Sequence, residues 1–277
     1  MFKLFKKKKK VQIPVLPEAF ENSAYKALSV NYDNFFDNFK NMPEDEKICK
    51  LENVKRISFE LSNLCNYSCY HKKCPLSLVK EKKTLDSDIF YKCIDELSCI
   101  NYSGVIAFHR YNEPLIDPRL FKFIEYTNAK IPDAKILILT NGFYLTDEIL
   151  RTFETCNIWC ICVSAYFKNE YERLIRLNTS IPLRVFFSIL DDRESIYESD
   201  PKGCKAPCFS PLSDLTVSSS GEVGLCCLDW KDMFTFGNLK ELSLSQVVSS
   251  DRFKEVCKDL QQGKRKLLIC RNCDWAR

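Results

Sequence analysis

Histidine is scarce in this chain: His71 and His109 are its two copies among 277 residues. Zinc sites that mix cysteine with histidine are therefore poorly supplied. No run of about 18 apolar residues without a charge occurs, so the sequence predicts no membrane-spanning helix. The first five residues lead into lysines without an apolar segment behind them, so we expect no secretory signal and a cytoplasmic location.

Net positive charge is also lacking outside one short run. The formal net charge is +4, and without the lysine run at 6–10 the chain is nearly neutral. Enzymes that act on nucleic acid usually carry a broad basic face, so a nucleic-acid partner is not expected. The lysine run has two interpretations, a solvated tail or a weak tether to anionic lipid with Phe2, Leu4 and Phe5 at the interface.

Cysteine, by contrast, is abundant, with 16 copies. Structural disulfides rarely persist in a reducing compartment, so this number of thiols indicates metal binding, catalysis or both. Ligation by thiolates alone favours iron–sulfur clusters, with zinc as the competitor. Cysteines within predicted helices and strands are expected to be small core hydrophobes: Cys93, Cys99, Cys156, Cys160 and Cys162.

Short apolar runs alternate with helical patterns through the middle of the chain. The expected strands are residues 57–61, 105–108, 135–140, 158–164 and 183–190, and the expected helices are 86–99, 117–130, 146–155 and 169–177. This order predicts a parallel α/β sheet with right-handed crossovers, either a closed or partial barrel or a doubly wound sheet. In each case ligands bind at the carboxyl ends of the strands.

The two ends of the chain differ from this middle. Residues 1–54 are expected to be a basic tail and an irregular lead-in with a short helix at 31–41, and residues 55–200 the α/β domain. Residues 201–277 form a small cysteine-rich module. There the segments 212–217 and 222–228 predict a β-hairpin turned at Gly221, followed by a helix at 244–262.

Three cysteines follow the first predicted strand directly, at Cys65, Cys69 and Cys74. Three thiolates on one loop can hold three irons of a cubane cluster and leave the fourth iron open. An open iron is what a catalytic cluster requires, because a substrate or cofactor must coordinate there. A zinc site or a purely structural cluster is the alternative.

The order Cys65-Asn66-Tyr67-Ser68-Cys69 resembles the first half of the cluster motif of the radical S-adenosylmethionine superfamily. The usual motif is C-x3-C-x2-C, whereas four residues separate Cys69 from Cys74 here. Lys73 stands where that family has an aromatic residue. Contact with the adenine ring is therefore assigned to Tyr70, with His71 as the alternative.

The resemblance continues at the other strand ends. Glu113-Pro114-Leu115 is similar to the family's G-G-E-P-L turn, and Thr140-Asn141-Gly142 matches its T-N-G. Ser164 ends the fourth strand, where the family often contacts ribose. The resemblance implies a partial (β/α)6-type TIM barrel and S-adenosylmethionine as cofactor. The residues it assigns to this cofactor are Asn112, Glu113, Thr140, Asn141, Ser164 and Tyr70.

A second set of cysteines lies in the C-terminal module, at Cys208, Cys226, Cys270 and Cys273. Its spacing resembles the shortened SPASM module called a twitch domain, which implies an auxiliary [4Fe-4S] cluster with four thiolate ligands. A zinc ribbon built from the same thiols is the alternative. Cys227 is expected on the opposite face of its strand from Cys226.

The resemblance implies reductive cleavage of S-adenosylmethionine to a 5′-deoxyadenosyl radical that abstracts hydrogen from a small substrate. We expect a dehydrogenase or epimerase of a carbohydrate or aminocyclitol, with a flavodoxin or ferredoxin as electron donor. The candidate catalytic residues are Cys204 or Cys227 as hydrogen donor, with spare core thiols as the alternative, and Arg184 as a base, with Asp191 or Asp192 at the fifth strand as alternatives.

Two other functions stay open. A maturase of a ribosomal peptide is the first, although residues 1–54 are too short and irregular for the usual peptide-binding domain. A non-catalytic zinc or iron–sulfur protein is the second.

Overall fold

The computed structural model describes residues 50–68, 74–78, 81–187, 197 and 205–273. Several predictions lie outside these residues: the helix at 31–41, the lysine run, the end of the fifth strand, and the side chains of Cys69, Tyr70, His71, Asp191, Asp192 and Cys204. None of the described helices has the length and apolar composition that crossing a bilayer requires.

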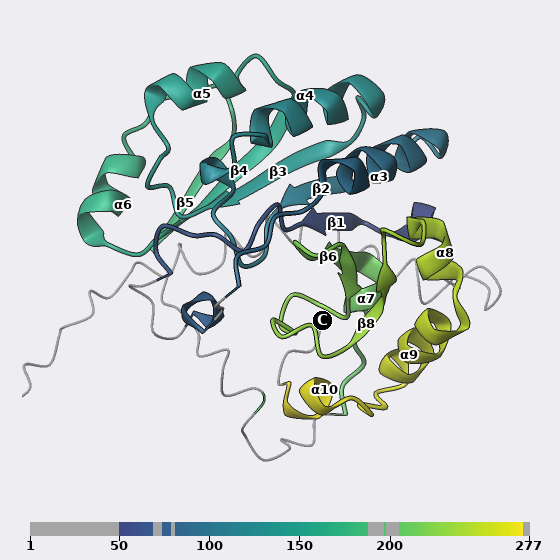
Figure 1. The fold of residues 1–277 in the computed structure, drawn as a ribbon. Helices are drawn as coiled ribbons and strands as arrows, with labels where there is room; N and C mark the ends of the chain where they lie inside the picture. Colours follow the sequence, from purple (N-terminus) through teal and green to yellow (C-terminus); the bar gives the residue numbers. More distant parts are fainter. Residues whose placement is uncertain (1–49, 69–73, 79–80, 188–196, 198–204, 274–277) are drawn as a thin grey trace, which may run out of the picture. The chain divides into compact units, whose positions relative to one another are not determined.

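The predicted alternation of strands and helices is confirmed (Figure 1). The strands are β1 (Arg56–Phe59), β2 (Val105–Phe108), β3 (Lys135–Thr140), β4 (Ile158–Ala165) and β5 (Leu183–Phe187), all paired in parallel. The helices between them are α3 (Ser87–Cys99), α4 (Leu120–Lys130), α5 (Asp147–Phe153) and α6 (Lys168–Leu174). Because the five strands are parallel, their carboxyl ends all lie at one edge of the sheet.

Side-chain caps explain where α3 and α5 begin. The Asp86 carboxylate accepts the Asp88 N–H at 3.0 Å, and the Thr146 hydroxyl accepts the Ile149 N–H at 3.3 Å. Such caps satisfy backbone donors that have no partner in the first turn. The helix predicted from residue 117 begins later, because a 3₁₀ turn at Pro114–Ile116 precedes it and Asp117 instead accepts the Arg119 N–H.

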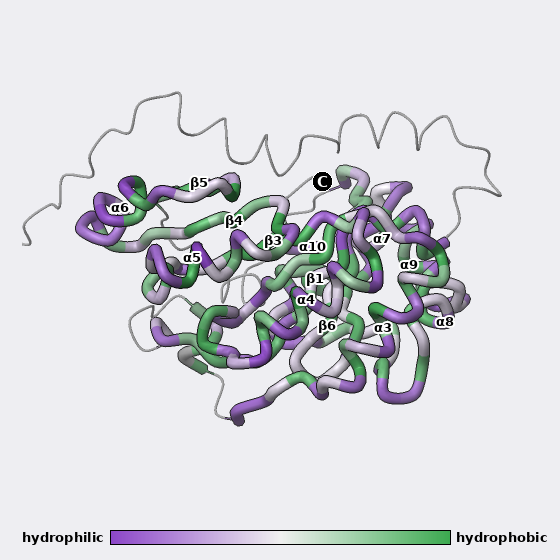
Figure 2. The backbone as a smooth tube through the Cα atoms, turned by 90° about the horizontal axis from the view of Figure 1, so that it is seen from above, coloured by the Kyte–Doolittle hydropathy of each residue, from purple (hydrophilic) through white to green (hydrophobic). Residues whose placement is uncertain are grey.

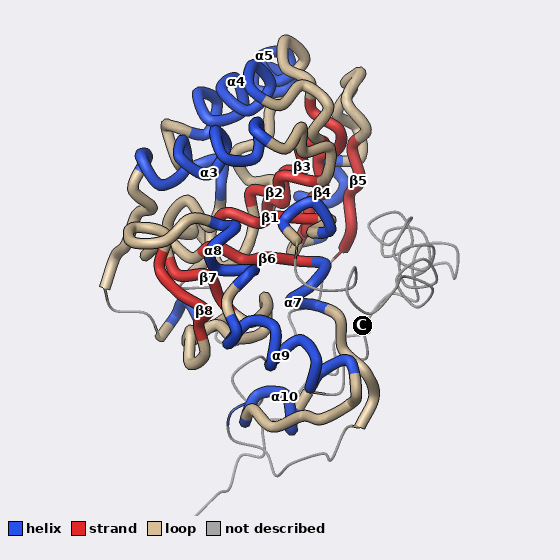
Figure 3. The backbone as a smooth tube through the Cα atoms, turned by 90° about the vertical axis from the view of Figure 1, so that its right-hand side faces the viewer, coloured by secondary structure: helices blue, strands red, loops and turns tan. Residues whose placement is uncertain are grey.

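The C-terminal hairpin joins the same sheet, whose strand order is β5-β4-β3-β2-β1-β6-β7-β8. Strand β6 (Asp214–Val217) pairs in parallel with β1, and β7 (Glu222–Gly224) and β8 (Thr235–Asn238) follow antiparallel. Figure 3 shows these strands extending the sheet beyond β1. The sixth parallel strand of the described sheet thus lies beside β1, at the opposite side of the barrel strands from β5.

Four details of this region differ from prediction. The first predicted strand opens with a helical turn, α7 (Ser210–Ser213), and β7 ends at Gly224, so Cys226 lies in a loop. The helix predicted at 244–262 is two helices, α8 (Leu244–Ser249) and α9 (Asp251–Gln261), because Ser250 has extended backbone and caps α9. A further short helix, α10 (Leu268–Asn272), carries Cys270.

An aromatic cluster packs the helices onto one face of the sheet. The Phe90 ring of α3 lies 4.9 Å from Phe59, 5.9 Å from Phe108 and 4.3 Å from Phe123, centroid to centroid. All four side chains are fully buried. Removing such a ring typically costs about 3–5 kcal/mol of unfolding free energy. In Figure 2 the outer helices alternate between hydrophilic and hydrophobic colours along their length, as one-sided burial requires.

The cysteines expected in the core divide into two groups. Cys93, Cys160 and Cys162 are buried, which confirms the prediction for them. Cys99 is exposed and Cys156 is half-buried, because they lie near the last turn of α3 and just beyond α5. The prediction was wrong for Cys99, whose thiol is instead near the Asp95 carbonyl at 3.4 Å.

Candidate active site and cysteine pocket

The first cysteine loop is held by contacts from two neighbouring strand ends. The Cys65 thiol accepts the Tyr67 N–H at 3.4 Å and lies 3.7 Å from Asn141 Nδ2. The Asn141 amide also donates to Asn66 Oδ1 at 2.8 Å. Burial raises the pKa of Cys65 to about 11, and the neighbouring Glu113 and Cys74 contribute to the rise. The half-buried Cys65 and Cys74 are thus close enough to interact electrostatically, which suits a shared positive centre.

Glu113 links the turns after β2 and β3. Its carboxylate accepts hydrogen bonds from the Leu115 N–H at 3.0 Å, the Thr140 hydroxyl at 2.6 Å and the Asn141 N–H at 2.7 Å. Its own N–H donates to the Leu64 carbonyl at 2.8 Å. Only 1% of the residue is exposed, and burial raises its pKa. Glu113 and Thr140 therefore hold the turns after β2 and β3 together.

Two asparagines present polar atoms that the described part of the chain leaves without partners. Both amide atoms of Asn112 and the Nδ2 of Asn66 are buried and make no hydrogen bond within it. Native proteins rarely leave buried polar atoms unpaired, so such atoms indicate a ligand or water. A ligand with both an ammonium and a carboxylate would satisfy the Asn112 amide, and the methionyl end of S-adenosylmethionine has both.

Tyr67 fixes the cysteine loop to α6. Its hydroxyl donates to the Glu170 carboxylate. Its ring makes edge contacts with Phe143 at 5.8 Å and with Phe167 at 5.7 Å. Burial comes first among the causes that raise the pKa of Tyr67, and Glu170 adds to the rise. The tyrosine therefore stays a neutral donor that holds the loop in place.

The second set of cysteines converges on one cavity. Its empty volume is about 300 Å³, part of which is open to solvent. Four of the lining residues are cysteines, and apolar side chains make up most of the rest: Cys208, Cys226, Cys270 and Cys273, with Leu225, Leu228, Leu260 and Ile269 among the apolar neighbours.

Burial and nearby thiols raise the pKa values of two of these thiols, Cys226 and Cys270. Burial is the first cause for Cys270, whose pKa is raised to about 12, and Cys208 adds to it. The pKa of Cys226 is raised well above its ordinary value by burial and by nearby thiols that include Cys227 and Cys270. Four thiols that repel one another as thiolates favour binding of a positive centre. The donor set thus fits a fully ligated cluster.

Distant parts of the chain supply these four thiols. Cys208 precedes α7, and its N–H donates to the Leu260 carbonyl at 2.9 Å. The Arg265 guanidinium donates twice to the Ala206 carbonyl, at 3.0 and 2.8 Å. Cys226 lies beyond β7, and Cys227 does not line the cavity. Cys226 and Cys227 both follow the end of β7, so the prediction that they lie on opposite faces of a strand is wrong.

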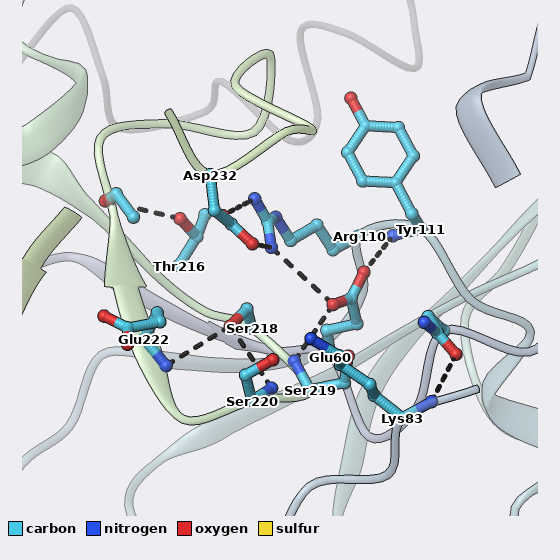
Figure 4. A network of polar contacts seen from close by, with 12 residues as sticks. Glu60, Lys83, Arg110, Tyr111, Thr216, Ser218, Ser219, Ser220, Glu222 and Asp232 are labelled. Carbon is cyan, nitrogen blue, oxygen red and sulfur yellow. Dashed lines mark hydrogen bonds and ion pairs between the residues drawn. The ribbon is translucent and has the colours of Figure 1, made fainter. Parts of the chain in front are cut away.

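The sequence does not predict a buried ionic network that the structure contains. Figure 4 shows Glu60, Arg110 and Asp232 joined by hydrogen bonds and ion pairs. Asp229, fully buried, accepts the Tyr197 hydroxyl at 2.6 Å and the Phe234 N–H at 3.0 Å. These residues are far apart in sequence. The one local signal is Glu60, a carboxylate that directly ends a buried strand.

The remaining predicted site residues lie on the sheet or beside the network. Ser164 is half-buried near the carboxyl end of β4. Arg184 pairs in register with Cys162 near the start of β5, and it contributes to lowering the pKa of Cys160, after a hydrogen bond from Cys162. The Cys227 carbonyl accepts the Tyr111 hydroxyl at 2.7 Å. The structure therefore does not bring Arg184 into contact with either cysteine set in any described interaction.

Comparison with known proteins agrees with this geometry. Residues 208–274 match the SPASM family model, an iron–sulfur cluster-binding domain. Over 231 residues the chain is 30% identical to the S-adenosyl-L-methionine-dependent 2-deoxy-scyllo-inosamine dehydrogenase of Niallia circulans, covering 79% of this chain and 92% of that enzyme.

Solved structures give the same result. The crystal structure of BtrN in complex with AdoMet and 2-DOIA superimposes with a TM-score of 0.68 at 27% identity, covering 80% of this chain and 93% of that one. The structure of anSMEcpe with AdoMet and a peptide shares the fold, with a TM-score of 0.52 at 12% identity, covering 79% of this chain and 86% of that one.

Fold, cysteine sets and similarity together define an iron–sulfur enzyme that uses S-adenosylmethionine. The chain belongs to the radical S-adenosylmethionine superfamily, in the subgroup that carries a SPASM or twitch module. Its cofactors are [4Fe-4S] clusters and S-adenosylmethionine, so the zinc alternatives for the two cysteine sets are set aside.

Proposed function

We propose that this enzyme oxidises a hydroxyl-bearing carbon of an aminocyclitol to a ketone. The observation that carries the proposal is the similarity to a 2-deoxy-scyllo-inosamine dehydrogenase along 92% of that enzyme's length. A cavity lined by four cysteines supports it, since a cluster without an open iron suits electron transfer better than cofactor cleavage. The peptide-modifying alternative rests on a likeness of fold alone.

The two cysteine sets have different proposed roles. Cys65, Cys69 and Cys74 hold the cluster with an open iron, at the carboxyl ends of the barrel strands. The auxiliary cluster is held by the four cysteines that line the cavity: Cys208, Cys226, Cys270 and Cys273. When bound, the first cluster and S-adenosylmethionine supply the radical that removes a hydrogen atom from the substrate.

The residues around the first set are proposed to hold the cofactor. The Asn112 amide binds its methionyl group, because both of its polar atoms are buried and unpaired within the described chain. Glu113, Thr140 and Asn141 keep that turn in shape, and Ser164 contacts the ribose from the end of β4. Tyr70, which lies outside the described residues, is proposed for the adenine.

Loss of a hydrogen atom leaves the substrate with one further electron and one hydroxyl proton to lose. We assign the electron to the auxiliary cluster. Arg184 is the proposed group that orients the reacting hydroxyl and assists the loss of its proton, from the inner side of β5. Cys227 and Cys204 are the thiols that would serve an epimerase, which would return a hydrogen atom. A cytoplasmic flavodoxin or ferredoxin is the proposed electron donor.

The test is turnover of 2-deoxy-scyllo-inosamine under anaerobic conditions with dithionite and S-adenosylmethionine. We expect 5′-deoxyadenosine and a product lighter by two hydrogens in equal amounts, detected by liquid chromatography and mass spectrometry. scyllo-Inositol, which lacks the amine, is the control and should react more slowly. A product of unchanged mass would indicate an epimerase, and cofactor cleavage without any substrate change would reject the proposed substrate.

A further inference from the structure

Arg110 is the centre of a buried ionic network at the end of β2. Its side chain is 2% exposed, and it pairs with Glu60 at 3.6 Å and with Asp232. Burial opposes its charge, but Glu60 and Asp232 together raise the pKa of Arg110 above its ordinary value. The guanidinium is therefore a fixed positive charge between two carboxylates (Figure 4).

The backbone of Arg110 is strained to reach this position. Its φ is +120°, in the left-handed region that residues with a side chain seldom adopt. Such strain persists where the surrounding structure imposes it, and it clusters at functional sites. At Gly224, a Cβ would lie 3.2 Å from Thr216 Oγ1, 3.4 Å from Asp232 Oδ1 and 3.8 Å from Arg110 Nη2. Because Gly224 has no side chain, it leaves room for the ion pair between Arg110 and Asp232.

One side of the network holds the loop that carries Cys226. Arg110 Nη2 donates to the Asp229 carbonyl at 2.8 Å, and Nη1 donates to Asp232 Oδ2 at 3.2 Å. The adjacent Tyr111 hydroxyl donates to the Cys227 carbonyl at 2.7 Å. All three contacts fall within six residues of Cys226, so they restrain this loop from the barrel side.

The other side of the network reaches the turn that precedes Asn112. The Glu60 carboxylate accepts the Tyr111 N–H at 3.0 Å through one oxygen and the Ser219 N–H at 3.0 Å through the other. Ser219 belongs to the turn between β6 and β7. One carboxylate thus binds the turn after β2 and the hairpin of the C-terminal module together.

We propose that Arg110, with Glu60 and Asp232, is a positioning residue that sets the place and the electrostatic environment of the auxiliary-cluster loop relative to the cofactor turn. The inference rests on the proposed role of that cluster as electron acceptor. The network couples hydrogen abstraction to electron removal, so that cofactor cleavage yields oxidised substrate. Arg110 touches neither cofactor nor substrate in this account.

A second connection between the same parts of the chain serves as the control. The Glu96 carboxylate of α3 accepts the Leu244 and Ser245 N–H groups at the start of α8, both at 2.8 Å. It joins the barrel to the C-terminal module without contacting the loop at 226–233 in any described interaction. Glu96→Gln therefore reports what loosening a merely structural contact does.

The experiment compares Arg110→Gln, Arg110→Lys and Asp232→Asn with Glu96→Gln in the reconstituted full chain. The first readout needs no substrate: a redox titration of the auxiliary cluster by electron paramagnetic resonance. Removing the positive charge should shift its potential to more negative values, and Asp232→Asn should shift it to less negative values. Arg110→Lys should return the potential toward that of the unchanged protein.

The second readout is the ratio of 5′-deoxyadenosine to oxidised product. Since an ångström of misplacement can cost about a hundredfold in rate, we expect this ratio to rise about tenfold or more in Arg110→Gln. Equal shifts in Glu96→Gln, or shifts of the same sign in Arg110→Gln and Asp232→Asn, would overturn the proposal. If the unchanged enzyme makes no product, the proposed substrate is wrong. The potentials of the auxiliary cluster in the variants still decide the role of Arg110.

Discussion

The two cysteine sites differ in how completely the described protein surrounds them. Cys65 lies on a loop with Asn66, and Asn112 lies in the turn after β2, whose Glu113 N–H binds the Leu64 carbonyl of that loop. The amides of both asparagines have buried atoms without hydrogen-bond partners in the described chain. The C-terminal cavity has four thiols and an apolar lining. One site thus presents polar groups for a ligand that must enter, and the other presents four thiols in a mainly apolar lining.

This difference matches the chemistry that is proposed for each site. A cluster that binds its cofactor needs an open iron and polar partners for the cofactor's charged groups. A cluster that accepts an electron needs shielding from solvent and a fixed place. The comparison predicts that changes at the first site abolish cofactor cleavage, whereas changes at the second uncouple cleavage from oxidation.

The largest effect is expected for Cys65→Ala. Loss of one of three ligands should prevent assembly of the first cluster, lower the iron content from about eight to about four per chain, and abolish 5′-deoxyadenosine formation. Iron analysis and chromatography measure both. Cys156→Ala, which removes a thiol that is also half-buried, is the control and should leave both unchanged. Cleavage of S-adenosylmethionine by Cys65→Ala would contradict the proposal that the first cysteine set holds the cluster that cleaves the cofactor.

Cys226→Ala should separate the two activities. The auxiliary cluster should be lost, together with about half of the iron, while S-adenosylmethionine is still cleaved and no oxidised product appears. The matched control is Cys257→Ala, which removes a buried thiol of α9 that does not line the cavity. If cleavage stops in Cys226→Ala while the first cluster remains assembled, the two sites do not have separate roles.

Asn112→Ala tests the unpaired amide. Loss of hydrogen bonds to a charged group costs about 1.5–3 kcal/mol, so S-adenosylmethionine should bind about tenfold to a hundredfold more weakly. Calorimetry on the reconstituted protein measures this. Asn128→Ala is the control, because its amide binds the Asn157 carbonyl at the other end of the sheet, at 3.2 Å. Unchanged affinity in Asn112→Ala would remove this residue from the cofactor site.

The smallest effect is expected for Tyr67→Phe, which removes the hydrogen bond to Glu170. We expect about 1–3 kcal/mol less unfolding free energy and a melting temperature several degrees lower, with both clusters retained. Thermal denaturation measures it. Tyr171→Phe, on the helix that carries Glu170, should lower the melting temperature less. An equal loss of stability in both variants would mean that the Tyr67 hydroxyl does not hold the loop.

Much of the barrel was predictable from the sequence because its signals are local. The apolar runs of β2 and β3 and the caps at Asp86 and Thr146 lie within the segments that they define. The C-terminal module was harder, because its strands are short. Ser250, which ends one helix and caps the next, has no effect on the apolar periodicity that predicted a single helix.

The candidate site also has a part that the sequence predicts and a part that it does not. The cysteine sets were predicted because their spacing is a sequence property, and the convergence of Cys208, Cys226, Cys270 and Cys273 on one cavity agrees with it. The partners of Arg110 were not predictable, since Glu60 and Asp232 lie 50 and 122 residues away along the chain. Such a network depends on the pairing of β1 with both β2 and β6.

The most direct test of the account is whether S-adenosylmethionine perturbs one cluster and not the other. Electron paramagnetic resonance spectra of the reduced protein, with and without S-adenosylmethionine, should be recorded for Cys65→Ala and Cys226→Ala. The account predicts that the cofactor changes the spectrum of the cluster that remains in Cys226→Ala and leaves that in Cys65→Ala unchanged. A cofactor-dependent change in Cys65→Ala would contradict it.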